Sequence, residues 1–185
     1  GEHEIDDPKN HDPELNIERV QIQPHAKAYP PVIKAIKKAD IILFGPGDLY
    51  TSIIPCFLPQ GIQQAFKESK AKKIFICPLM NKLGETHEMS VKDFSNEIER
   101  YMDTELDHVL YNNKIPQKER IEKHKNKGEN LTGLVPLGEV ENNEKYIGEN
   151  LIPEDGLIIH KPKRVIDSIE KIASSKLRPR LNVSN

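Results

Sequence analysis

Short apolar runs and amphipathic segments alternate along this chain. Residues 41–44 form a continuous apolar run that ends at Gly45-Pro46-Gly47, and residues 73–79 form a second run. Apolar runs of this length that stop at turn residues are typical of strands buried on both faces of a sheet. A third short run, at 108–111, predicts one more strand of this kind.

Between these runs, apolar residues recur at helical spacing. Residues 30–39 open with two prolines, which suit the first turn of a helix, and their apolar positions fall on one face. Residues 60–69 show the same spacing. Ser90 and Asp93 form a capping box in front of an apolar stripe, and Pro162 suits the first turn of a last helix.

This order of elements predicts an α/β fold, a Rossmann-like three-layer sandwich with a mostly parallel sheet. The apolar positions of residues 17–22 suit a first strand, so the chain would open with a βαβ unit and its right-handed crossover. Pro116 starts a segment with charges of alternating sign, which predicts a solvent-exposed helix. Residues 131–140 and 146–152 are interrupted by glycine or proline, which predicts short strands or turns.

Composition narrows the class of protein. Charged residues make up 30% of the 185 positions, and no apolar run approaches the roughly 18 residues needed to cross a bilayer. The N-terminus lacks the basic and apolar regions of a signal peptide. The formal charge of -2 creates no general attraction to nucleic acid or to anionic membranes. We therefore expect a cytoplasmic protein that binds neither.

Three parts are expected along the chain: a flexible loop at 1–15, the C-terminal portion of one α/β domain at 16–175, and a tail at 176–185. The two cysteines, Cys56 and Cys77, have no metal-binding spacing, so we expect reduced thiols that pack in the fold. The protein is expected to form a homo-oligomer.

The first candidate ligand-binding residues follow the first apolar run. Gly45 and Gly47 let backbone amides approach an anion because no Cβ stands in the way, and Thr51 and Ser52 add hydroxyl groups. Open parallel sheets bind their ligands at this end of the strands. The alternative is that Gly-Pro-Gly only turns the chain and that the hydroxyl groups cap the next segment.

Two more loops should lie beside the first, since neighbouring parallel strands present their carboxyl ends together. They are residues 79–87 and the end of the third strand at Asn112. The three loops supply amides, hydroxyls, carboxylates and a carboxamide, which suit a phosphate-bearing ligand and its sugar hydroxyls. The candidate ligand-binding residues are Gly45, Pro46, Gly47, Asp48, Tyr50, Thr51, Ser52, Gly84, Glu85, Thr86 and Asn112.

Two histidines are further candidates for contact with a ligand phosphate. His87 lies in the second loop and His160 precedes the last helix. The alternative for each is an ordinary surface histidine. No His-x-x-x-His pair occurs in the chain, so a zinc site is not expected.

The first loop resembles a known motif. Residues 45–53, Gly-Pro-Gly-Asp-Leu-Tyr-Thr-Ser-Ile, are similar to the Gly-Pro-Gly-Ser-Leu-Tyr-Thr-Ser-Ile segment of the gluconeogenesis factor family, the relatives of 2-phospho-L-lactate transferase. They differ from it at Asp48. Residues 80–87 resemble the family's Met-Thr-Gln-Pro-Gly-Glu-Thr-Asp. Gly84, Glu85 and Thr86 match it, whereas other positions, Asn81 and Leu83 among them, depart from it.

Two weaker correspondences lie further along the chain. Asn112 corresponds to an asparagine that commonly ends the next strand of the family, and residues 160–162 resemble its His-Asp-Pro. The match covers residues 1–112, but the family's opening Gly-Gly-Gly-Thr-Gly turn is absent. The resemblance therefore implies the C-terminal half of the family's fold, with a sheet that is incomplete at its N-terminal side.

The function implied by the resemblance is regulatory. Family members bind a nucleotide sugar such as UDP-N-acetylglucosamine and affect carbon use and cell shape. The first alternative is a transferase resembling 2-phospho-L-lactate transferase, with magnesium held by Asp48 and Glu85. Against catalysis, no nucleophile has an obvious adjacent base, so we expect a protein that is not an enzyme. The second alternative is a protein-interaction module with a vestigial pocket.

Overall fold

A parallel sheet of four strands lies at the centre of the computed structural model, which describes residues 4, 5, 7, 9, 11–126, 130–140 and 143–174. Each neighbouring pair of strands in this sheet runs parallel. β2 is buried at every position, as expected for a central strand, and its first two residues, Lys72 and Lys73, are buried together with the apolar ones. The strands, in their order across the sheet, are β1 (Ile41–Phe44), β2 (Lys72–Ile76), β4 (His108–Asn112) and β6 (Tyr146–Glu149).

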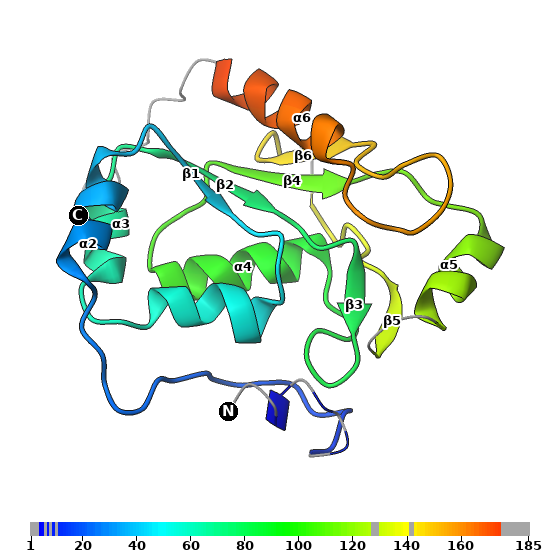
Figure 1. Ribbon diagram of the computed structural model, residues 1–185, viewed down its shortest axis with the longest axis horizontal. Coiled ribbons are helices and arrows are strands. Elements are labelled where there is room, and N and C mark those ends of the chain that lie inside the picture. The colour runs from blue at the N-terminus through cyan, green and yellow to red at the C-terminus, as the bar shows by residue number, and fades with distance from the viewer. Residues whose placement is uncertain are drawn as a thin grey trace.

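Helices cover both faces of this sheet (Figure 1). α3 (Ile62–Glu68) and α4 (Val91–Met102) connect β1, β2 and β4, which follow one another in a single direction across the sheet. Right-handed crossovers that advance in one direction place their helices on the same face. α6 (Pro162–Ser174) packs on the opposite face, against Ile74 and Leu110. The predicted three-layer α/β architecture is confirmed.

A second, two-stranded sheet lies at the carboxyl edge of the first (Figure 1). It pairs β3 (Met80–Lys82) with β5 (Leu131–Leu134) in antiparallel fashion. α5 (Lys118–Lys125) lies beside β5. The sequence predicted only a loop at 79–87, so β3 is an element that the apolar pattern did not reveal.

The strand predicted at 17–22 is wrong. Within the described part of the chain these residues have no ladder partner, and they run as an extended segment past α4. The amide of Val20 donates to the Tyr101 hydroxyl at 2.7 Å, and the Arg100 guanidinium donates to the Glu18 carbonyl. Side chains of α4 thus take the place of a neighbouring strand. α2 (Pro30–Lys38) still forms as predicted, but the first βαβ unit is β1–α3–β2.

Local hydrogen bonds and a glycine turn determine where α4 begins and where β1 ends. The Ser90 hydroxyl accepts from the Asp93 amide at the start of α4, and the Asp93 carboxylate accepts from the Ser90 amide, which confirms the predicted capping box. At the end of β1, Gly45 has a φ of +75°, and a Cβ there would stand 3.0 Å from the Ile76 carbonyl oxygen. Only glycine fits this turn without strain.

Among the described residues, no helix combines the length and the apolar character needed to cross a bilayer. The predicted tail at 176–185 lies outside the described residues.

Candidate functional site

The loop after β1 leads directly into helical turns. Residues 45–48 are followed by a π-helical turn, Leu49–Ile53, and a 3-10 turn, Ile54–Phe57. The amides of Ser52 and Ile53 both donate to the Asp48 carbonyl. Single π-helical turns occur frequently at functional sites, and this one contains the Leu-Tyr-Thr-Ser of the first motif.

Two contacts join the first motif to the second. The Tyr50 amide donates to Oε1 of Glu85 at 2.9 Å, and Nζ of Lys82 lies 3.2 Å from Oδ2 of Asp48. The Tyr50 amide lies at the start of the helical turn and has no partner within the turn. The buried Glu85 carboxylate supplies that partner. The loops after β1 and β2 therefore lie side by side, as the sequence predicted.

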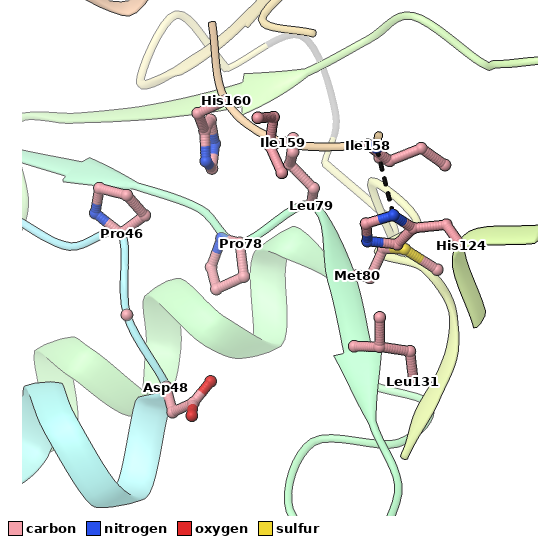
Figure 2. A pocket seen from close by; sticks show the side chains of 11 residues that line it. Pro46, Asp48, Pro78, Leu79, Met80, His124, Leu131, Ile158, Ile159 and His160 are labelled. Carbon is pink, nitrogen blue, oxygen red and sulfur yellow. Dashed lines mark hydrogen bonds between the residues drawn. The ribbon is translucent and has the colours of Figure 1, made fainter. Parts of the chain in front are cut away.

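Two adjoining cavities open between these loops. The histidine cavity has a volume of about 270 Å³ and is lined by Pro46, Gly47, Asp48, His124 and His160, with Pro78 and aliphatic side chains between them (Figure 2). The lysine cavity, of about 60 Å³, is lined by Asp48, Lys82, Glu85 and Thr86. Both include Asp48, Pro78, Met80 and Leu131 in their walls.

The two histidines enter the histidine cavity from different elements (Figure 2). Nε2 of His160 is buried without a hydrogen-bond partner among the described residues, while the ring hydrogen-bonds to the backbone of Cys77. Burial lowers the pKa of His160, and the Cys77 contact opposes this only in part. Nδ1 of His124 accepts from the Ile158 amide at 3.3 Å, so the neutral ring carries its proton on Nε2.

The lysine cavity combines three buried polar residues, Lys82, Glu85 and Thr86, with the exposed Asp48. The side chain of Lys82 is 10% exposed and that of Asp48 is 48% exposed. Thr86 is buried, and its hydroxyl accepts from the Lys82 amide at 3.1 Å. Ammonium and hydroxyl groups in this arrangement can donate hydrogen bonds to phosphate oxygens.

Several predicted residues lie outside these two cavities. The Tyr50 hydroxyl donates to Glu97 on α4, and burial together with the Glu97 carboxylate raises the pKa of Tyr50. Ser52 is exposed and Thr51 is half-buried, and neither lines the cavities. The remaining four such residues are Gly45, Gly84, His87 and Asn112.

The third loop holds Asn112 in place. Its Oδ1 accepts from the Leu151 amide at 3.1 Å, and its Nδ2 donates to the Lys114 carbonyl at 2.7 Å. Asn112 lines a third cavity, the apolar pocket, of about 430 Å³, which shares Pro78 and Leu79 with the histidine cavity. All three predicted loops thus contribute to adjoining cavities at the carboxyl edge of the sheet.

The sequence did not reveal two polar residues that line these cavities. Lys82 lies on β3, which was not predicted, and no spacing in the sequence pairs it with Asp48. His124 was assigned to a solvent-exposed helix, yet it faces the histidine cavity. Arg120 and His124 are spaced i and i+4, so they share a face of α5, and both bind residues 153–158.

Magnesium does not fit the two carboxylates proposed for it. Glu85 is engaged by the Tyr50 amide, and the Lys82 ammonium beside Asp48 places a positive charge where the ion would bind. Among the described residues, no three histidine, cysteine, aspartate or glutamate side chains group as a metal site.

Comparison with known proteins agrees with the motifs. The family model described as 2-phospho-L-lactate transferase CofD matches residues 1–151. This chain belongs to the CofD family. Its relatives include a putative gluconeogenesis factor of Thermotoga maritima, 39% identical over 162 residues, which are 85% of this chain and 51% of that protein. The gluconeogenesis factor of Listeria monocytogenes is 34% identical over 158 residues, 83% of this chain and 48% of that one.

A solved structure also resembles this CofD-family chain in its fold. A member of the UPF0052 family from Bacillus halodurans superposes with a TM-score of 0.76 at 28% identity, over 92% of this chain and 54% of that one. The predicted resemblance to gluconeogenesis factors is therefore confirmed. The chain spans about half the length of the relatives it matches.

Proposed function

We propose that this chain forms part of a regulatory protein that binds a nucleotide sugar of the UDP-N-acetylglucosamine type and acts on carbon metabolism and cell shape. The observation that carries the proposal is the contact between the two motifs, where Asp48 forms an ion pair with Lys82 and Glu85 accepts a hydrogen bond from the Tyr50 amide. The relatives named gluconeogenesis factor support the regulatory role in carbon metabolism.

The ligand would place its phosphates across the histidine and lysine cavities. The Lys82 ammonium and the Thr86 hydroxyl are donors in the lysine cavity, and Gly47 leaves the backbone of the first loop open to an anion. The Asp48 carboxylate would accept from sugar hydroxyls, because a carboxylate has only acceptor positions.

A transferase is the second candidate. The matching family model is described as a 2-phospho-L-lactate transferase, and that description favours transfer of a phosphate-containing group. The two carboxylates are already engaged, however, and their arrangement does not suit magnesium. The regulatory proposal therefore ranks first.

A thermal-shift titration tests the proposal. UDP-N-acetylglucosamine should raise the melting temperature with increasing concentration, because ligand that binds only the native state adds about 2.7 kcal/mol of stability at 100 times its Kd. Lys82→Met should weaken binding about tenfold or more, since a charge-assisted hydrogen bond to phosphate is lost. Lys70→Met, at an exposed lysine of the same size, is the matched control.

Each outcome has a clear meaning. If UDP-N-acetylglucosamine, UDP-glucose and UDP all leave the melting temperature unchanged, the proposal is wrong. If stabilisation requires magnesium, the transferase candidate replaces the regulatory one.

A further inference from the structure

The apolar pocket adjoins the cavities assigned to phosphate. Pro78 and Leu79 form part of both the apolar pocket and the histidine cavity. Its volume of about 430 Å³ lies within the usual range for small-molecule sites, roughly 300 to 1,000 Å³. A ligand group in the apolar pocket would therefore lie next to the proposed phosphate positions.

The lining of the apolar pocket selects against charge. Its surface is mostly apolar, and its lining includes the aliphatic side chains of Leu79, Val91, Ile115, Leu134, Val135 and Leu137. Among the described residues that line it, the exposed Lys114 alone is charged, and none carries a carboxylate. A phosphate would lose its hydration in this pocket with little compensation, whereas an uncharged group with apolar faces gains stability from burial.

One edge of the apolar pocket is polar and held in place. Asn112 is fixed by the Leu151 amide and the Lys114 carbonyl, and Nδ2 of Asn113 donates to the Gly148 carbonyl at 2.9 Å. Each Nδ2 group carries a second hydrogen that these bonds do not use. Carboxamides in fixed positions beside apolar walls match a ring that has hydrogen-bonding atoms on its edge and apolar faces.

Tyr111 adds a flat surface beside these amides. A Cβ on Gly148 would stand 2.6 Å from the Tyr111 hydroxyl oxygen, so the tyrosine ring lies against the bare backbone of β6. At the mouth of the pocket, Ile115 is 78% exposed. A ring that enters the pocket would cover part of Ile115 and remove this apolar surface from water.

We propose that the apolar pocket binds an uncharged planar heterocycle. The proposal rests on the proposed function for the position of the neighbouring phosphates. The ring is either the base of the same nucleotide ligand or a second molecule that binds beside it.

The test is an NMR titration of the whole chain with labelled isoleucine, leucine and valine methyl groups. Uridine and adenosine are the uncharged probes, and UDP and inorganic phosphate are the charged ones. We expect the nucleosides to shift the methyl signals of Ile115, Val135 and Leu137. Phosphate should instead shift the signals of Leu131 and Ile159, which line the lysine and histidine cavities.

Substitutions at isoleucine confirm the location. Ile115→Ala removes a rim contact from an exposed side chain, so the fold is retained, and nucleoside binding should weaken about tenfold. Ile166→Ala is the control, because Ile166 is also exposed but lies on α6, away from the pocket. Val135→Phe, which fills the pocket, should abolish the shifts.

The two proposals fail separately. This inference is overturned if the nucleosides shift no methyl signal of the apolar pocket. It is also overturned if they bind Ile115→Ala as tightly as the unchanged protein. If neither phosphate nor UDP-N-acetylglucosamine shifts the methyl signals of Leu131 and Ile159, the proposed function is overturned instead. If the ring belongs to the nucleotide, UDP shifts both sets of signals in one titration. If it is a second molecule, the nucleosides shift the pocket signals even at saturating UDP.

Discussion

His160 combines a buried ring nitrogen with a place on the wall of a polar cavity. Its buried Nε2 has no hydrogen-bond partner among the described residues, while the hydrogen bond to the Cys77 backbone holds the ring above Pro46 and Pro78 (Figure 2). Removal from water disfavours the charged imidazolium, so the pKa of His160 lies below the ordinary value of about 6.5. At neutral pH the ring is neutral.

The lowered pKa of His160 makes stability depend on pH. Between the lowered pKa and about 6.5, the unfolded chain binds a proton at this position that the folded chain does not, so the free energy of unfolding falls as pH falls through this window. Above the unfolded pKa the effect is absent. Urea denaturation at several pH values should show that the free energy of unfolding falls less steeply towards acid pH for His160→Gln than for the unchanged protein. His25→Gln, at an exposed histidine, should behave like the unchanged protein, and identical curves for all three would contradict the prediction.

α5 is a polar helix that is nevertheless attached to the site. It has no buried residue, which fits its charged sequence, and the sequence predicted a solvent-exposed face. Arg120 donates from its three nitrogens to the carbonyls of residues 153–157, and His124 accepts from Ile158. These contacts connect α5 to the segment that leads to His160.

Arg120→Lys should release this attachment. Lysine has a single ammonium group and cannot reproduce the fork of guanidinium donors, so we expect a loss of about 1 to 3 kcal/mol in stability. Hydrogen exchange should show faster exchange in α5 and at Ile158, with β2 unchanged. Arg19→Lys is the control, since Arg19 is exposed and away from this loop. Equal exchange rates in both variants would show that the carbonyl contacts do not hold the helix.

β1 is an edge strand among the described residues. It pairs with β2 alone, and Leu43 is 46% exposed on the face that α6 covers elsewhere. An unpaired strand edge with apolar side chains favours association with another chain. The expected homo-oligomer and the protein-interaction alternative both depend on surfaces of this kind, and both remain predictions.

The β1 edge should cause self-association of the 185-residue chain. Sedimentation velocity should show an average mass that rises with protein concentration, and Leu43→Lys should reduce this rise by adding charge and removing apolar surface. Leu157→Lys is the matched control, because Leu157 is 47% exposed but lies outside the sheet. A chain that stays monomeric at all concentrations, or equal behaviour of the two variants, would contradict the prediction.

The apolar runs and capping signals of this chain were sufficient to predict β1, β2, β4 and the helices, because short-range periodicity records which face of an element is buried. The first two loops could be recognised for the same reason, since strand ends and glycine turns are local features. The segment at 17–22 has the pattern of a strand but is satisfied by side chains of α4, and that partner is far away in sequence. Lys82, His124 and the apolar pocket likewise depend on contacts between distant residues. Long-range packing is set by the whole fold, so only the three-dimensional structure could bring these groups to one edge of the sheet.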